Sequence, residues 1–277
     1  MADQDPNAPA RFMDLQDPRY AYMFGFLQAD GHLSEQSRQR GRLTVELNVR
    51  DVALLHEFRR LTPYNSSVVE RARSTNFSSS SRTAVWAVSA HEARTVINEL
   101  GVPYGRKSRI IAPPRTEFSR RDYVRGLIDA DGSVGYTGKG HPFVSLTTAS
   151  TAIGAYLCHF ARKVTGAERT IKRNARDGVY NILYTNETAV QLASHLYYDG
   201  CLALERKRSS AAALSTWVRP ADMPRAAPRR RWTTAEDLRL LELGDPASAA
   251  APLDRTESAC RQRLTRLRTG RGPWLQH

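Results

Sequence analysis

Residues 43–49 alternate strictly between apolar and polar side chains, which is the pattern of a β-strand with one buried face. The apolar face carries Leu43, Val45, Leu47 and Val49. The opposite face carries Arg42, Thr44, Glu46 and Asn48. One face of the predicted sheet therefore packs on a core, and the other face is polar and available to a partner.

Around this strand, apolar residues recur every three or four positions in several segments, which is the spacing of amphipathic helices. A short strand before residue 43 completes a strand pair, and two more strands flank the Ser-rich loop 76–81. The predicted helices are 19–30, 51–61 and 90–100, and the later strands lie near 67–73 and 82–89. The first part of the chain therefore has the order αββαββα.

The same order returns in the second part of the chain. Its predicted elements are helix 120–131, strands 133–137 and 142–148, helix 151–165, strands 168–175 and 179–185, and helix 187–198. The dipeptide Asp177-Gly178 between the last two strands is a strong hairpin signal. We therefore predict an α+β fold of two pseudo-symmetric halves, residues 18–118 and 119–217, each with four antiparallel strands.

Each half opens with the same helical phrase, residues 23–31 and 124–132. Both copies carry two small residues one turn apart on one helix face, a spacing that lets two helix backbones approach closely. These residues are Gly25, Ala29, Gly126 and Ala130. We therefore expect the two helices to pack side by side and parallel, so that they join the two halves.

Both phrases end in Asp-Gly, although the helix dipole disfavours an acidic residue at the C-terminal end of a helix. Asp131 follows Asp30 by 101 residues. Each half also has a lysine beyond its last predicted helix: Lys107 lies 77 residues after Asp30, and Lys207 lies 76 residues after Asp131. The matching distances support an internal duplication, and they predict that these four charged groups meet at one end of the helix pair.

Two carboxylates held close together repel each other unless a cation lies between them. Carboxylate oxygens and the unpaired carbonyl oxygens of a last helical turn suit a hard divalent ion. The sequence therefore predicts a Mg²⁺ site, with Mn²⁺ as an alternative and Ca²⁺ as a non-catalytic substitute. Its predicted ligands are the side chains of Asp30 and Asp131 and the carbonyl oxygens of Ala29 and Ala130. With the two lysines, such a site indicates phosphodiester hydrolysis, one site serving each strand of a duplex.

The net charge agrees with a nucleic-acid partner. The formal charge is +13 and the pI is about 10.1, which indicates a polyanion. The three cysteines are far apart and form no zinc or disulfide pattern, so we expect a reducing compartment, cytoplasmic or organellar. No apolar run reaches transmembrane length and no signal-peptide core is present, so we expect no membrane partner.

The two ends of the chain differ in composition from the duplicated region. Residues 1–17 show no periodicity and are predicted to be disordered, and the Pro-, Ala- and Arg-rich residues 218–230 are predicted to be a linker. Residues 231–270 begin with a capping box at Thr233 and contain two predicted helices, of which the second is rich in arginine. We interpret this region as a small helix-turn-helix-like DNA-binding module.

The repeated phrase resembles the LAGLIDADG motif of homing endonucleases. The second copy matches the motif at seven consecutive positions, from Gly126 to Gly132. The first copy is looser and has Gln28 where the family has its first Asp. It keeps Gly25, Ala29, Asp30 and Gly31. The resemblance covers residues 19–215, and the final acidic residue of each motif is the one that binds metal in the family.

This resemblance implies two four-stranded antiparallel sheets that saddle DNA and a metal-dependent cut of both strands across the minor groove, leaving 3′ overhangs. Lys107 and Lys207 resemble the family's active-site lysines. The polar strand faces then contact the major groove. The candidates are Arg42, Thr44, Glu46, Asn48, Arg71 and Arg73 in the first half and Ser145, Thr147, Thr170, Lys172 and Asn174 in the second. Because these two sets differ, we expect an asymmetric target.

The C-terminal region is similar to short Myb/SANT-like or resolvase-like helix-turn-helix modules, with Arg255 and Thr256 opening the recognition helix and Arg261 within it. The leading prediction is therefore a single-chain, monomeric homing endonuclease that cuts double-stranded DNA during intron homing. Two alternatives on the same fold remain open: a non-catalytic DNA-binding regulator, and a splicing maturase that binds intron RNA. An intein is disfavoured because the chain lacks a terminal Asn and an N-terminal splicing nucleophile.

Overall fold

The first half of the chain folds in the predicted order. The computed structural model describes residues 11–34, 40–75, 78–223 and 232–269, and within 73–81 it describes no side chains. The elements are α1 (Pro18–Asp30), β1 (His32–Leu33), β2 (Leu43–Asn48), a 3₁₀ turn (Val49–Asp51), α2 (Val52–Leu61), β3 (Ser66–Thr75), β4 (Ser78–Val88) and α3 (His91–Glu99). Strand β4 begins at Ser78, so the predicted loop 76–81 is wrong for residues 78–81, and residues 76–77 lie outside the described part of the chain.

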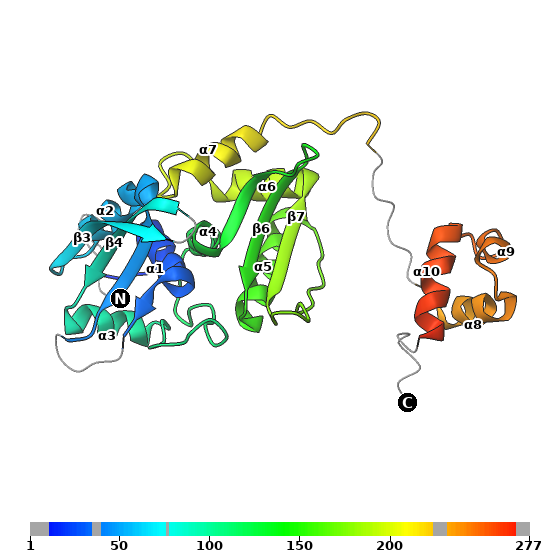
Figure 1. The fold of residues 1–277 in the computed structure, drawn as a ribbon, viewed down its shortest axis with the longest axis horizontal. Helices are drawn as coiled ribbons and strands as arrows, with labels where there is room; N and C mark the ends of the chain where they lie inside the picture. Colours follow the sequence, from blue (N-terminus) through cyan, green and yellow to red (C-terminus); the bar gives the residue numbers. More distant parts are fainter. Residues whose placement is uncertain (1–10, 35–39, 76–77, 224–231, 270–277) are drawn as a thin grey trace, which may run out of the picture. The chain divides into compact units, whose positions relative to one another are not determined.

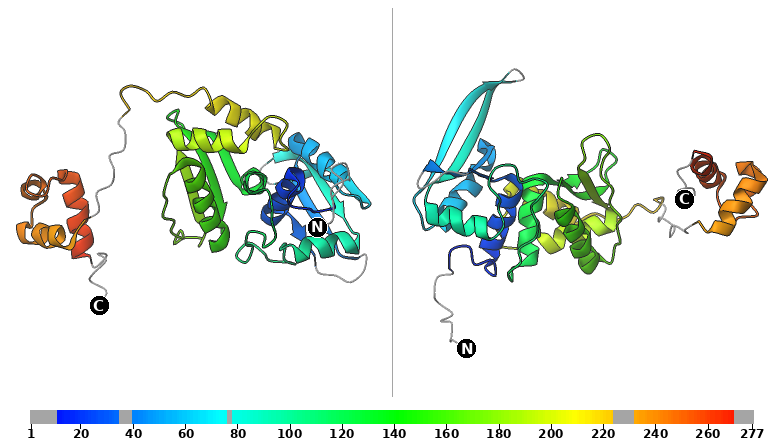
Figure 2. Two further views of the ribbon diagram at one scale, coloured as in Figure 1. Left: turned by 180° about the vertical axis from the view of Figure 1, so that it is seen from behind. Right: turned by 90° about the horizontal axis from the view of Figure 1, so that it is seen from below.

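The first sheet has the strand order β1-β2-β4-β3, and all neighbours are antiparallel. Leu43 and Val45 of β2 are buried beneath the sheet, whereas Glu46 and Asn48 are exposed on the other face. The alternation along residues 43–49 therefore identified the buried face correctly. Helix α2 packs against β2, β3 and β4, and the β3–β4 hairpin projects from the rest of the first half (Figure 2).

The second half contains α4 (Arg120–Asp131), β5 (Gly132–Tyr136), β6 (Pro142–Thr148), α5 (Thr151–Thr165), β7 (Tyr180–Thr185), α6 (Asn186–Leu196) and α7 (Glu205–Leu214). Its sheet has three antiparallel strands in the order β5-β6-β7. The predicted strand 168–175 does not form, so the prediction of four strands is wrong for this half.

Local contacts explain why residues 168–175 do not form a strand. Ile171 is the only large apolar residue among them, so a strand here would bury little apolar surface. The guanidinium of Arg173 instead donates to the carbonyl oxygen of Gly178 at 2.8 Å and to the hydroxyl oxygens of Thr151 and Tyr180. The predicted turn at residues 177–178 is present. The backbone N–H of Asn174 closes it by a hydrogen bond to the carbonyl oxygen of Val179.

Helices α1 and α4 lie side by side between the two sheets (Figures 1 and 2). Every residue of α1 from Tyr20 to Gln28 is buried, so this helix is enclosed on all sides by the core of residues 11–219. Residues 11–17 are not disordered as predicted, because Met13 and Leu15 are buried in the same core. Residues 1–10 lie outside the described part of the chain.

The described residues after position 219 include a second compact unit, residues 232–269, with its own small core. Its helices are α8 (Thr234–Leu243), α9 (Pro246–Ala250) and α10 (Glu257–Arg268). The predicted capping box of Thr233 and Glu236 is confirmed. Helix α9 was not predicted, because its Pro- and Ala-rich sequence has the composition of a loop. The buried core comprises Leu240, Ala249, Leu253, Cys260, Leu264 and Leu267.

Two further features bear on the predictions from composition. None of the helices in the described ranges has both the length and the apolar character that crossing a membrane would require. Cys158, Cys201 and Cys260 are all free cysteines, with no disulfide bond between them.

Candidate functional site

The candidate site lies at the C-terminal end of the pair α1 and α4, which we call the motif helices. Their backbones touch at two glycines. A Cβ atom on Gly25 would lie 2.3 Å from the carbonyl oxygen of Tyr123, and a Cβ atom on Gly126 would lie 2.2 Å from the carbonyl oxygen of Tyr22. The two contacts are equivalent under the internal repeat, and only glycine permits them. Ala29, one turn further along, is partly buried.

The helix pairing brings the terminal aspartates of the two motif helices close enough to interact electrostatically. Asp30 and Asp131 keep access to solvent at the ends of their helices, and the surrounding protein desolvates part of each carboxyl group. Partial burial raises the pKa of the Asp30 carboxyl group, and the charge of Asp131 raises it further, whereas Lys107 and Lys207 lower it. Burial likewise raises the pKa of Asp131, against the opposing effect of the same two lysines. The helices are therefore parallel, as predicted, with their acidic ends together.

Each lysine binds the carbonyl end of the motif helix in its own half. Lys107 Nζ donates to the carbonyl oxygens of Gln28 at 2.7 Å and Ala29 at 2.5 Å. Lys207 Nζ donates to three carbonyl oxygens, of Ile128 and Asp129 at 2.7 Å and of Gly132 at 2.8 Å. These carbonyls belong to the helix ends, where most have no partner within the helix, so the ammonium groups satisfy them.

Burial of the two lysine side chains disfavours the charged ammonium form. It lowers the pKa of Lys107, although Asp131 and Asp30 oppose the shift. It lowers the pKa of Lys207 from 10.5 to about 8, with Asp129 opposing the shift. Lys107 lies in a loop and Lys207 on α7, so the repeat preserves the position of the ammonium group but not the element that carries it.

The sequence did not reveal the role of the residue two positions before each terminal aspartate. Gln28 and Asp129 occupy equivalent positions in the two phrases, and both are fully buried. Tyr123 donates its hydroxyl to Gln28 across the helix interface, and Tyr22 donates its hydroxyl to Asp129 in the reverse direction. Two polar residues at matching positions of an apolar phrase were the available signal.

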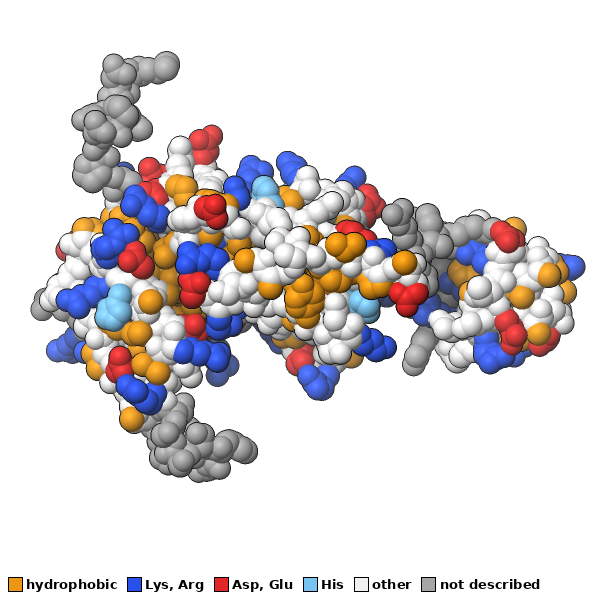
Figure 3. All heavy atoms as spheres, turned by 90° about the horizontal axis from the view of Figure 1, so that it is seen from above, with side chains coloured by type: hydrophobic (Ala, Val, Ile, Leu, Met, Phe, Trp, Pro, Cys, Tyr) orange, Lys and Arg blue, Asp and Glu red, His pale blue; other side chains and the backbone are white. Residues whose placement is uncertain are grey.

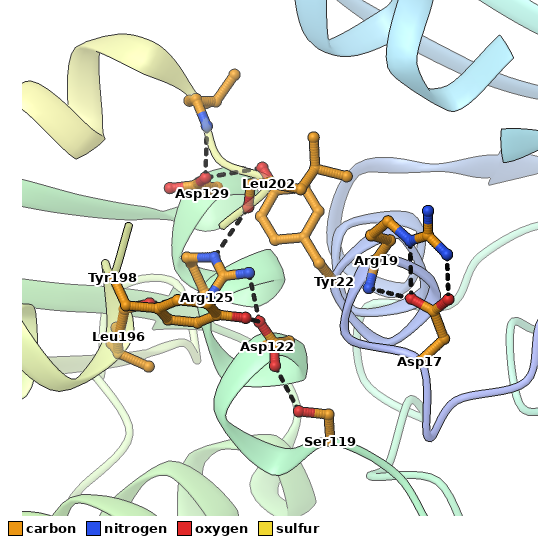
Figure 4. Close-up of polar contacts among 11 residues, drawn as sticks. Asp17, Arg19, Tyr22, Ser119, Asp122, Arg125, Asp129, Leu196, Tyr198 and Leu202 are labelled. Carbon is orange, nitrogen blue, oxygen red and sulfur yellow. Dashed lines mark hydrogen bonds and ion pairs between the residues drawn. The ribbon is translucent and has the colours of Figure 1, made fainter. Parts of the chain in front are cut away.

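A second buried network ties α4 to the segment that leads to α7 (Figure 4). Arg125 donates to the carbonyl oxygens of Leu196 at 2.8 Å and Leu202 at 2.9 Å, and it forms an ion pair with Asp122. Tyr198 also donates to Asp122, at 2.7 Å. Under the internal repeat, position 24 is equivalent to position 125, and its phenylalanine side chain cannot form these hydrogen bonds.

The structure places the predicted DNA-contacting residues in two kinds of environment. Arg42, Glu46, Asn48, Arg71 and Thr147 are exposed, and Thr44 and Ser145 are partly exposed on the polar sheet faces. The remaining second-half candidates, Thr170, Lys172 and Asn174, lie in the irregular segment before β7 rather than on a strand. The side chain of Arg73 lies outside the described part of the chain.

In the C-terminal unit the two predicted arginines differ. Arg255 is about nine-tenths buried, forms an ion pair with Glu236 at 3.0 Å and lies over the ring of Trp232. Both of these contacts are with residues of the C-terminal unit itself. Arg261 projects from α10 and is 69% exposed, with an ion pair to Glu257. The sequence did not predict the buried ion pair between Arg263 and Asp237, which links α10 to α8.

An open pocket follows the end of α1. Its lining is rich in basic groups and comprises Gly31, His32, Gly105, Arg106, Lys107, Ser108 and Arg109. Among the described residues, no group of three or more His, Cys, Asp or Glu side chains gathers at one point. Two carboxylates beside a basic pocket nevertheless fit Mg²⁺, which is commonly held by one or two carboxylates and completes its shell with water and phosphate oxygens.

Replacement of Asp131 by asparagine should stabilise the protein in metal-free buffer at pH 7. A carboxyl group whose pKa is raised by folding binds its proton more tightly in the folded state. Stability therefore falls as the pH rises from 3.8 through the folded-state pKa and stays reduced above it. The asparagine side chain cannot ionise, so we expect a higher melting temperature for this variant.

Thermal unfolding of Asp131→Asn and of wild type in EDTA measures this difference. The matched control is Asp199→Asn, which alters an exposed aspartate between α6 and α7 and should leave the melting temperature unchanged. A lower melting temperature for Asp131→Asn would show that the carboxylate is stabilising and that the repulsion between the two aspartates is unimportant.

No protein-family model matches the sequence, and no curated protein matches it either. Among solved structures, the chain is similar to the homing endonuclease I-WcaI bound to its DNA recognition sequence, with a TM-score of 0.50 and 13% identity over 71% of this chain and 87% of I-WcaI. The meganuclease I-SmaMI bound to uncleavable DNA gives 0.48 and 12% identity over 72% and 87% of the two chains. The N-terminal LAGLIDADG domain of WhiA gives 0.44 and 13% identity over 70% and 86%. The likeness to I-WcaI confirms the predicted α+β fold with antiparallel sheets.

Proposed function

We propose that the protein is a metal-dependent, site-specific endonuclease that cuts both strands of a DNA duplex. The observation that carries this proposal is the meeting of Asp30 and Asp131 at the paired ends of the motif helices, each beside a buried lysine. The two halves supply equivalent groups, which matches the two scissile phosphates of a duplex. Structures of the same fold, such as I-WcaI, contain bound DNA.

In this proposal the carboxylates of Asp30 and Asp131 hold the divalent ion, with Mg²⁺ or Mn²⁺ supporting cleavage and Ca²⁺ supporting binding alone. When bound, the ion would activate water for attack and neutralise charge on the leaving oxygen. The Ala29 carbonyl already accepts a bond from Lys107, so a metal would share it with an ammonium group. We therefore keep the two carboxylates as the principal ligands.

The lysines have a separate role in this mechanism. Lys107 and Lys207 each present a positive charge next to a terminal aspartate, and each is held in place by backbone carbonyls. A fixed cation stabilises the negative charge that develops on phosphate oxygens in the transition state. With a pKa of about 8, Lys207 is mostly protonated at pH 7 and can fill this role.

The remaining surface suits a long DNA duplex. Lys and Arg side chains occur at several places on the face of residues 11–219 in Figure 3, so basic charge is spread along the molecule. The polar faces of the two sheets differ in their residues, for example Glu46 and Arg71 in one half and Ser145 and Thr147 in the other. We therefore propose an asymmetric target. The resemblance to LAGLIDADG endonucleases further implies that a monomer binds this target and cuts it across the minor groove, leaving 3′ overhangs.

Cleavage of a randomised duplex library tests the proposed function directly. The wild-type protein with Mg²⁺ should enrich cut molecules that share one sequence, and EDTA should remove the activity. Binding to DNA without any cutting would favour a regulator on the same fold, and preferential binding of intron RNA would favour a maturase.

Removal of the C-terminal unit should weaken binding to the selected duplex. A chain of residues 1–219 keeps its own core but loses α10 with the exposed Arg261. Loss of a tethered contact lowers the effective concentration, so we expect the dissociation constant to rise about 10- to 100-fold, with a smaller dependence on salt. Binding titrations of both chains at several salt concentrations measure this effect, and equal affinities would contradict a DNA contact by this unit. The full-length variant Arg261→Ala should give a smaller loss in the same direction.

A further inference from the structure

We propose that Gln28 and Asp129 are positioning residues, each of which holds the lysine of its own half against the end of a motif helix. This inference rests on the proposed nuclease function and adds residues that do not themselves touch DNA or metal. Both residues are buried, and neither faces the carboxylate end of the site with a free group, so their side chains act through the segments that they bind.

In the first half, Gln28 binds the loop that carries Lys107 on both sides of that lysine. Its amide nitrogen donates to the carbonyl oxygens of Gly101 at 2.8 Å and Ala112 at 2.9 Å. Its amide oxygen accepts the hydroxyl of Tyr123 from the other motif helix. One side chain therefore fixes the two ends of the segment 101–112 to α1.

In the second half, Asp129 binds the segment that leads into α7. Its carboxylate accepts the backbone N–H of Leu204, the N-cap residue of α7, at 2.7 Å and the hydroxyl of Tyr197 at 2.6 Å. It also accepts the hydroxyl of Tyr22 from α1 at 2.7 Å. Lys207 follows Leu204 by less than one helical turn, so this contact fixes the position of the Lys207 backbone relative to α4.

The same two residues also bind the lysines through their main chains. The carbonyl oxygen of Gln28 accepts Lys107 Nζ, and the carbonyl oxygen of Asp129 accepts Lys207 Nζ, both at 2.7 Å. Each residue therefore clamps the lysine-bearing segment with its side chain and the ammonium group with its carbonyl. This double contact recurs in both halves although one lysine is on a loop and the other on a helix.

The difference between the two side chains follows from what each one meets. Gln28 faces two backbone carbonyls, which accept hydrogen bonds only, so a donor is needed and a carboxylate would fail. Asp129 faces a backbone N–H and two hydroxyls, so an acceptor is needed. Both positions therefore anchor a lysine-bearing segment. The first phrase has glutamine where the second has aspartate because the partners of Gln28 require a hydrogen-bond donor.

Lysine reactivity in the full-length protein tests this inference without reference to nuclease activity. An amine-acylating ester followed by peptide mass spectrometry, in metal-free buffer without DNA, reports how often each lysine leaves its carbonyls. Gln28→Leu should raise acylation of Lys107 about tenfold and leave Lys207 unchanged, because the bonds to a lysine-bearing segment that this variant loses are those to the loop of Lys107. Asp129→Leu should raise acylation of Lys207 and leave Lys107 unchanged.

Conservative variants separate hydrogen bonding from side-chain volume. Gln28→Glu should behave like Gln28→Leu, because a carboxylate offers no donor to Gly101 and Ala112. Asp129→Asn should restore part of the protection, because its oxygen still accepts from Leu204, whereas loss of the carboxylate charge lowers the pKa of Lys207 and leaves more of the reactive neutral amine. Tyr123→Phe keeps the ring and removes one bond to Gln28, so it gives a milder test if the leucine variant does not fold. In cleavage assays, Gln28→Leu should lower kcat with little change in KM.

Unchanged reactivity of Lys107 in both Gln28→Leu and Gln28→Glu would overturn the inference, as would an equal rise at both lysines in each variant, which would indicate general loosening. The lysine-reactivity test is independent of the cleavage test of the proposed function. If the wild-type protein fails to cut DNA, the nuclease proposal fails, whereas the lysine reactivities still decide whether Gln28 and Asp129 position these groups.

Discussion

Asp30→Asn and Asp131→Asn should each abolish double-strand cleavage while leaving DNA binding intact. Asparagine has nearly the same volume as aspartate but cannot supply a charged oxygen to a divalent ion. A bound ion contributes several kcal/mol of transition-state stabilisation, so we expect the cleavage rate to fall at least about 1000-fold. Binding should persist, because the substitution removes a negative charge that repels phosphates.

A supercoiled plasmid that carries the selected target reports this result, because nicked, linear and uncut forms separate on one gel. Asp199→Asn again provides a matched control, since it alters an exposed aspartate outside the site. Normal cleavage by both variants would exclude these carboxylates as metal ligands. Weak binding by either variant would show that the aspartates support the DNA-bound structure rather than the chemical step.

Much of the fold was predictable because it is encoded locally. Alternation along residues 43–49 identified the buried face of the first sheet, and helix α5 coincides with the predicted range 151–165. The duplicated phrase was equally informative, since Gly25 and Gly126 are required by a close backbone approach and not by local structure. The pairing of Asp30 with Asp131 followed from this interface.

The features that sequence analysis missed depend on contacts between distant residues. The bonds of Arg125 to Leu196 and Leu202 join positions more than 70 residues apart, and no local pattern encodes them. Strand 168–175 was wrongly predicted because side-chain bonds of Arg173 compete with sheet formation. The role of Gln28 was hidden for a related reason: its partners, Gly101 and Ala112, are backbone carbonyls of another segment.

Gly25→Ala and Gly126→Ala should each destabilise the protein strongly. The added methyl group would lie within 2.3 Å of a backbone oxygen of the opposite helix, and backbone cannot move aside as a flexible side chain can. Overpacking a core usually costs about 1–3 kcal/mol, and this contact lies at the upper end or beyond it. We therefore expect the melting temperature to fall by about 6–12 °C, measured by the loss of far-UV circular dichroism.

The control for this effect is Gly138→Ala, because a Cβ atom there meets no atom within 4 Å. If Gly25→Ala and Gly138→Ala unfold at the same temperature, the motif helices do not approach as closely as the structure indicates. A variant that folds provides a second measurement, because a wider helix pair moves Asp30 away from Asp131. Its cleavage rate at saturating DNA should then fall, since a displacement of about 1 Å in a catalytic group can cost about 100-fold. The two glycines would thus control both the stability of the interface and the separation of the carboxylates that it brings together.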